Sequence, residues 1–283
     1  MKTRGRTTHG LALGLTVLII GWGYLACAIE ITDTGEVIEQ SANGYFNWTV
    51  RKLEAIGFAD PNQPAYAQVK AAQIAARAEL LAILRGIRIR GEYGIIDGLM
   101  RKDISEVELE GFISNSYVTT PKMNERGLVE AKAFVYLDNS GNTMLIPQRV
   151  LLNQENKKWE TSEGNNGGTV SKRTGLIIDA RGLGLKPGLA PRVLVEGEMS
   201  GTYGSDPAEM AIAYDSGFVG YVGSMEKAHA MKDRIGENPL EIRAVGKANT
   251  SDIVIGRLGA AAISRSLKQY DFLKECRVVV VVN

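Results

Sequence analysis

The chain contains very little cysteine and histidine. Its 283 residues include two Cys and two His, and one of each, Cys27 and His9, lies within the first 28 residues. Protein metal sites draw mostly on clustered His and Cys, and nucleophilic sites on a Cys or Ser beside a base. Only His229 and Cys276 remain beyond residue 28, and neither has a partner of these types nearby in the sequence. We therefore expect no catalytic residues, no metal and no cofactor, and interpret the protein as non-enzymatic.

An excess of positive charge is also missing. The formal net charge of the whole chain is +1, and without the basic residues Lys2, Arg4 and Arg6 it falls to about −2. Nucleic-acid binding requires a basic patch that neutralises phosphates, so no nucleic-acid partner is expected. A single Cys beyond residue 28 cannot form an internal disulfide, so the core must hold by packing alone.

The N-terminus has the three parts of a secretory signal. A basic head is followed by the uncharged stretch 10–28, whose middle is a continuous apolar run. Ala26 and Ala28 supply the small residues that a cleavage site requires. We therefore predict a signal peptide over residues 1–28 and an exported protein, located in the periplasm or on the periplasmic face of the outer membrane.

Three fates of this signal remain open. The first is cleavage after Ala28. The second is lipid attachment at Cys27, although Tyr24 stands where a lipidation motif has an aliphatic residue. The third is an uncleaved anchor, because the uncharged stretch is just long enough to cross a bilayer. Contact with a membrane is thus expected through the signal or through a lipid.

The first domain is expected over residues 44–160, after a polar tether at 29–43. Phe46, Trp48 and Val50 alternate with polar residues, which predicts one half-buried strand over 44–59. The segments expected after it are a helix at 64–86 with an Ala-rich face that packs closely on a sheet, a short extended piece at 87–90, a helix from the Ser105–Glu108 capping box to 111, and strands at 112–120 and 127–137.

The second domain is expected over residues 174–283, with the boundary between the domains in the polar stretch 160–173. The β-branched run at 277–282 is typical of a central strand covered on both faces. The other expected elements are strands at 175–180, 192–195, 211–214, 240–245 and 252–255, and helices at 224–231 and 256–269. The fold class predicted is α+β, with two small domains, each an antiparallel or mixed sheet packed by one or two helices.

The most distinctive local feature follows the strand at 175–180. A Gly-rich loop there carries both signs of charge, and one interpretation is a binding site for an anion or a peptidoglycan fragment. The interpretation that we favour is a tight turn ordered by a pair between Asp179 and Arg181. The loop lacks the third glycine and the following helix of a dinucleotide site. The candidate ligand-binding residues are Asp179, Arg181, Gly182, Gly184 and Lys186.

Several segments together resemble known bacterial families. Gly44 with Trp48, the run Glu54–Gly57, and the Ala-rich helix ending in Leu80–Ile87 resemble the Lpp-twenty lipoprotein family. The same unit, over about 44–137, is similar to the N-terminal domain of flagellar assembly protein T. The block Thr174–Pro187, with the ending Phe272–Val278, resembles the C-terminal half of exported bacterial proteins that carry such a first domain. Tyr24 and Ala59 depart from the pattern.

The resemblance implies a structural role. Members of these families are structural parts associated with the outer membrane, including a disk or ring around the flagellar motor. The function expected is therefore a non-enzymatic structural or assembly protein of the cell envelope, with a flagellar basal-body association as one form of it. The expected partners are further copies of the chain, or envelope and flagellar proteins. The alternative is a periplasmic module that binds an anionic envelope component.

Overall fold

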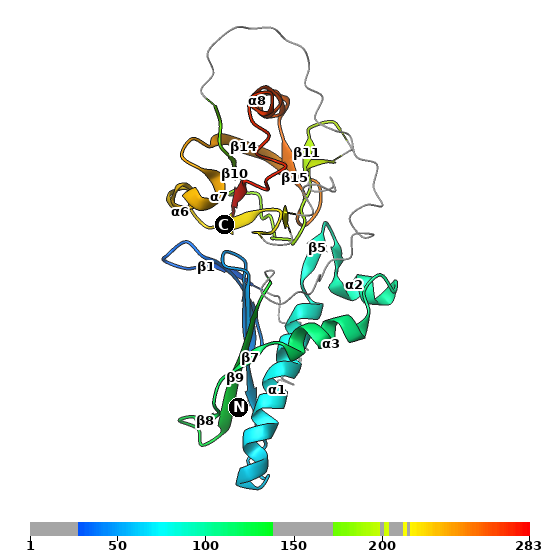
Figure 1. Cartoon of the computed structure of the whole chain (residues 1–283), viewed down its shortest axis with the longest axis vertical. Helices are drawn as coiled ribbons and strands as arrows, with labels where there is room; N and C mark the ends of the chain where they lie inside the picture. Colours follow the sequence, from blue (N-terminus) through cyan, green and yellow to red (C-terminus); the bar gives the residue numbers. More distant parts are fainter. Residues whose placement is uncertain (1–27, 138–171, 199–200, 204–211, 214–215) are drawn as a thin grey trace, which may run out of the picture.

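The protein is an α+β protein with two domains, here in a computed structural model that describes residues 28–137, 172–198, 201–203, 212–213 and 216–283 (Figure 1). Most of the predicted signal, including Cys27, lies outside the described residues, as does nearly all of the predicted boundary at 160–173. Across the described part of the chain, every helix is too short or too polar to cross a membrane. The predicted limits of the domains at 44–160 and 174–283 stay predictions.

The first domain is built on an antiparallel sheet of seven strands in the order β1-β2-β3-β4-β9-β7, with β8 also paired to β9. Its strands are β1 (Ile29–Ile31), β2 (Val37–Ser41), β3 (Gly44–Asn47), β4 (Lys52–Phe58), β7 (Tyr117–Val118), β8 (Lys122–Met123) and β9 (Val129–Tyr136).

Helix α1 (Ala65–Arg85) covers one face of this sheet, as the sequence predicts. It follows Pro64 and ends at Gly86. Its small residues allow close contact: a Cβ atom built at Gly57 of β4 would lie 2.0 Å from the backbone nitrogen of Ala76. The expected close packing of the Ala-rich face on a sheet is therefore confirmed.

A short hairpin and two helices follow α1. They are β5 (Arg88–Arg90), β6 (Tyr93–Gly94), α2 (Ile95–Met100) and α3 (Glu106–Ser114). The capping box is confirmed in both directions: Glu108 N–H donates to the Ser105 hydroxyl at 3.1 Å, and Ser105 N–H donates to the Glu108 carboxylate at 2.9 Å.

Three expectations for this domain are wrong. The predicted tether at 29–43 forms β1 and β2. The single strand predicted at 44–59 is β3 and β4 joined by a turn in which Arg51 adopts a left-handed φ of 55°. Residues 112–114 of the strand predicted at 112–120 belong to α3, because the capped helix continues until Asn115.

The second domain is built on a mixed sheet in the order β12-β11-β15-β14-β10-β16-β13. The neighbours β14, β10, β16 and β13 run parallel. All four residues of β16 are buried, so its predicted place inside the sheet is confirmed. The strands are β10 (Leu176–Asp179), β11 (Val193–Val195), β12 (Gly201–Tyr203), β13 (Gly220–Val222), β14 (Leu240–Lys247), β15 (Ile253–Ile255) and β16 (Val278–Val281).

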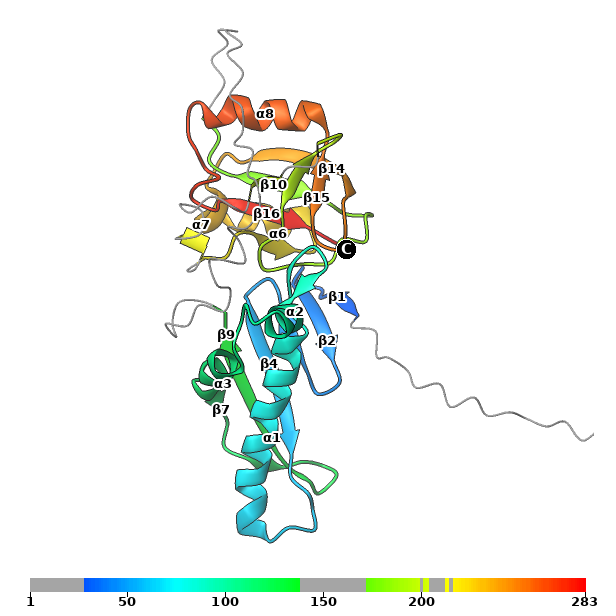
Figure 2. The same cartoon turned by 90° about the vertical axis from the view of Figure 1, so that its right-hand side faces the viewer.

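Helices lie on both faces of this second sheet (Figure 2). One face packs on α6 (Met225–Ala230) and α7 (Lys232–Ile235), and the other on α8 (Arg257–Leu267). The strand predicted at 211–214 lies partly outside the described residues, and Ile212 and Ala213 are helical. One buried apolar cluster runs through both domains, from Val37 to Val282.

Candidate functional site: the junction between the two domains

The predicted ligand-binding loop begins with an internal ion pair. The Arg181 guanidinium donates to both carboxylate oxygens of Asp179, Nε to Oδ1 at 2.8 Å and Nη2 to Oδ2 at 2.9 Å. The backbone N–H of Arg181 donates to the same carboxylate at 3.1 Å. These hydrogen bonds lower the pKa of Asp179 below its ordinary value of 3.8. The geometry is that of the tight turn, and ligand binding here stays a prediction.

The other predicted residues of this loop have separate neighbours. Gly182 and Gly184 both adopt left-handed φ angles, which favour glycine. Gly182 N–H donates to the Asn283 side chain at 2.6 Å. The side chain of Lys186 is exposed, and its backbone N–H donates to Thr250 O at 2.9 Å. The two cations predicted to bind a ligand thus differ: the Arg181 side chain is paired with Asp179, whereas the Lys186 side chain is exposed.

Strand β14 contributes two cations that the sequence did not point to. Arg243 is paired in register with Asp179, and Lys247 Nζ donates to Gly184 O at 2.6 Å. Two carboxylates lie in the same region: Glu226 is near Arg181, and Glu241 is two residues before Arg243 on β14. The loop is therefore a region of mixed charge.

The end of the same loop binds the first domain. Leu189 N–H donates to Arg88 O at 3.0 Å, and Ala190 N–H donates to Ile89 O at 2.8 Å, so the loop extends along β5. Arg88 Nε also donates to Pro187 O at 3.0 Å. The Gly-rich loop is therefore a connection between the domains as well as a turn.

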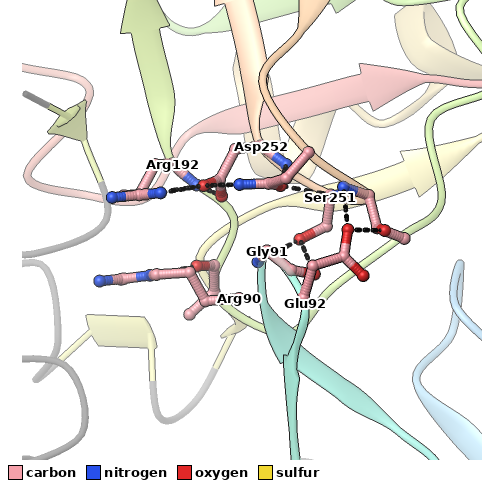
Figure 3. Close-up of polar contacts among 9 residues, drawn as sticks. Arg90, Gly91, Glu92, Arg192, Ser251 and Asp252 are labelled. Atoms are coloured by element: carbon pink, nitrogen blue, oxygen red, sulfur yellow. Dashed lines mark hydrogen bonds and ion pairs between the residues drawn. The ribbon is translucent and has the colours of Figure 1, made fainter. Parts of the chain in front are cut away.

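The tip of the β5–β6 hairpin meets the turn between β14 and β15 (Figure 3). Gly91 N–H donates to the Ser251 hydroxyl at 2.7 Å, and Arg90 Nε donates to Ala190 O at 2.8 Å. The Glu92 carboxylate accepts from the hydroxyl of Thr250 and from its backbone N–H, the latter at 2.9 Å. Those two bonds lower the pKa of Glu92.

A buried carboxylate organises that turn. Asp252 is completely buried and accepts from Arg192 three times, from Nη2 at 2.5 Å, from Nε at 2.7 Å and from the backbone N–H at 2.9 Å. The Asn249 side chain donates to it at 2.8 Å. Because a buried charge is costly unless paired, these donors hold the turn in the shape that receives the hairpin.

The apolar half of the junction centres on Trp48. Its ring meets that of Tyr221 at a centroid distance of 5.7 Å, and its Nε1 donates to the Glu39 carboxylate at 2.9 Å. Arg88 Nη2 donates to the same carboxylate at 2.6 Å. The Tyr221 hydroxyl accepts from the N–H of Gly188 and donates to its carbonyl, at 3.1 and 3.0 Å. Burial raises the pKa of Tyr221.

The first domain covers one end of the second sheet. Thr49 Oγ1 donates to Tyr221 O at 2.7 Å, and Gly223 N–H donates to Gly35 O at 2.9 Å. The strands β10, β14, β16 and β13 all end on this side. Open α/β sheets bind their ligands beyond the carboxyl ends of parallel strands. In this protein the first domain lies there.

Two residue types scarce in the chain lie elsewhere. His229 is on α6, half-exposed, with Nε2 3.4 Å from a carboxylate oxygen of Glu241. Cys276 is buried. Within the described ranges, no three His, Cys, Asp or Glu side chains are grouped so that they could hold a metal ion.

The fold and junction define a class: a two-domain α+β protein whose domains are joined by a buried polar and aromatic interface. Residues 175–283 match the family model described as the second domain of Treponema pallidum Tp0624. The match includes the second domain's share of the junction, namely Gly188, Tyr221 and the 249–252 turn. No curated protein matches the chain.

This comparison corrects the resemblance noted in the sequence. The suggested relation to the Lpp-twenty lipoproteins and to flagellar assembly protein T is wrong, because the family model that matches belongs to a different family. Packing accounts for the residue types at Gly44, Trp48 and Gly57. Gly44 and Gly57 lie where backbones approach closely, and Trp48 packs on Tyr221 at the junction. The flagellar role rested on that resemblance and falls with it.

Proposed function

We propose that the protein is a non-enzymatic structural component of the cell envelope that works as one two-domain unit. The observation that carries this proposal is the position of the first domain across the carboxyl ends of the parallel strands. The polar side chains gathered there, among them Arg88, Glu92 and Asp252, bind groups within the junction. Such an arrangement favours a fixed relation between the domains over the binding of a small molecule.

The location and partners belong to the same proposal. The basic, apolar and small-residue parts of 1–28 support export, and we place the mature protein in the periplasm or on the inner face of the outer membrane. Its partners would be further copies of the chain or other envelope proteins.

The test is fractionation and chemical crosslinking in cells that express the full chain. The expected result is recovery in the envelope fraction, with crosslinked species larger than the monomer. A protein found only as a free monomer, without a crosslinked partner, would contradict the proposal. The matched variant is Tyr221→Ala, which removes the aromatic contact with Trp48 and should reduce crosslinking if the joined domains are the working unit.

A periplasmic ligand-binding module is the second candidate. The observation that favours it is the exposed turn at Gly182, with Arg243 of β14 beside Asp179. An anion would have to compete with Asp179 for Arg181. Binding to purified peptidoglycan should then be lost in the double variant R181A/K186A and retained in R265A, which removes an exposed charge on α8. Equal binding by both variants would remove this candidate.

A further inference from the structure

We infer that two copies of this chain associate through the face of the first sheet that α1 leaves uncovered. This inference rests on the proposed function, because it names the partner of an assembling protein. In Figure 1 the sheet is seen nearly edge-on, with α1 and α3 on one side; among the described helices, none lies on the other side. We call that other side the open face.

The open face is a continuous surface. The registers place Gln40, Tyr45, Glu54, Phe134 and Tyr117 side by side in one row across five strands. Neighbouring rows add more apolar side chains, so that aromatic and aliphatic groups occupy much of the surface. The apolar residues of the open face are Ile38, Tyr45, Ile56, Phe58, Tyr117, Phe134 and Tyr136.

Three aromatic rings of the open face contact one another. Tyr117 stacks on Phe134 with centroids 5.3 Å apart and planes at 17°, while Lys52 Nζ lies 4.7 Å from the centre of the Phe134 ring. Tyr136 meets Phe134 edge to face. A flat platform for stacking sugars needs free ring faces, whereas Tyr117 and Lys52 already lie against the Phe134 ring. Two packed sheets instead interdigitate the side chains of their facing surfaces. The geometry therefore favours sheet-on-sheet packing.

On the open face, the strands carry equal numbers of the two signs of charge, namely Lys52, Lys122 and Lys132 against Glu30, Glu54 and Glu130. The Glu54 carboxylate lies 2.6 Å from Lys52 Nζ and 4.0 Å from Lys132 Nζ, and Glu54 is largely buried between them. A partner with strong charge of one sign would have to break these pairs. A second copy brings an equal number of both signs, so covering the face adds no excess of either sign.

The size of the open face suits a dimer that forms as the concentration rises. The five strands β2, β3, β4, β9 and β7 have between two and eight residues each. With strands about 4.8 Å apart and a rise of about 3.4 Å per residue, they give a flat footprint of about 420 Å², before side-chain relief is counted. A stable interface of standard size buries about 800 Å² on each partner, so the dimer is expected to be weaker than one of that size. The edge formed by β7 and β8 is less suitable, because each of these strands has two residues and Pro121 separates them.

The test is the oligomeric state of the full chain, measured by light scattering and sedimentation over a range of concentrations. The wild type should pass from monomer to dimer as the concentration rises. The double variant Y117K/F58K places like charges on both copies at side chains that are 67% and 41% exposed. It should raise the dissociation constant at least about tenfold while leaving the circular dichroism spectrum unchanged.

The matched control is Y66K/I74K, which adds the same charge at exposed positions of α1 and should leave the dimer unchanged. If the double variant does not fold, the single variant Y117K, which changes only a two-residue edge strand, is used to test the dimer interface instead. A wild type that is monomeric at every concentration, or a dimer weakened equally by the control, overturns the inference. If that monomer still crosslinks to other envelope proteins in cells, the proposed function stands and only the choice of partner is wrong.

Discussion

Trp48 of the first domain and Tyr221 of the second meet edge to face, with ring centroids 5.7 Å apart and ring planes at 76°. Both rings are almost completely buried, and each uses its polar atom in a hydrogen bond. The pair therefore joins the apolar cores of the two domains into one cluster, and the domains should unfold together.

Replacing Trp48 by Leu tests this coupling. The change removes an aromatic contact and leaves the buried Glu39 without one donor, so we expect a loss of about 3 kcal/mol in the free energy of unfolding. Calorimetry should show one transition in the wild type and a lower, broader or divided transition in the variant. Tyr66→Leu, at an exposed position of α1, should change little. Two separate transitions in the wild type would show that the domains unfold independently.

Two glycines give opposite predictions for the same substitution. Gly57→Ala should cost about 3 kcal/mol or more, because the added methyl group would meet the backbone of α1 at Ala76. Gly111→Ala, in α3 with open space around it, should instead stabilise by about 0.5–1 kcal/mol through helix propensity. Chemical denaturation measures both, and similar effects at the two sites would contradict the close contact of α1 with β4.

The buried carboxylate of the junction should be sensitive to removal. Asp252→Ala leaves Arg192 without its ion-pair partner, so we expect a loss of about 3–5 kcal/mol. Asp271→Ala breaks an exposed pair with Lys274 and should change stability by less than about 1 kcal/mol. Equal effects in thermal unfolding would mean that the 249–252 turn is not held by this carboxylate.

The Asp179–Arg181 pair predicts a dependence on pH. The pKa of Asp179 is lower in the folded protein than its ordinary value of 3.8. The pair therefore stabilises the fold fully above that value and is lost as the pH falls through the lower, folded pKa. The stability difference between the wild type and Arg181→Gln should be constant near neutral pH and shrink below about pH 4. For Arg265→Gln, far along α8, we expect a difference without that dependence.

The elements with strong local signals could be predicted from the sequence. Helix α1 has a regular apolar stripe between Pro64 and Gly86, and β16 is a run of valines. The break between β3 and β4 was missed because its turn, residues 48–51, contains neither Gly nor Pro. A sign of it was present: buried positions change from even to odd numbers between Trp48 and Leu53.

The junction could not be predicted, because its contacts join distant parts of the chain. Gly91 and Ser251 are 160 positions apart, and neither belongs to a recognisable motif. The Gly-rich loop did attract notice, but its glycines and charges are equally typical of a ligand site and of a docking segment. Only its hydrogen bonds to β5 identify the loop as a docking segment, and such bonds between a loop and a strand far apart in the sequence leave no local pattern in either.

The short strand β1 determines how the molecule would respond to force. Ile31 of β1 lies against Gly223, just after β13, while Val282 N–H donates to Val222 O near the end of the chain. The first strand and the last residues of the described fold therefore both lie beside the junction between the domains (Figure 1). Tension applied between Ile29 and Asn283 would therefore act first on β1 with its partner β2, and on β16 with its neighbour β13. Helix α8 and the β8 turn lie at the far ends of the molecule, away from these strands (Figure 1).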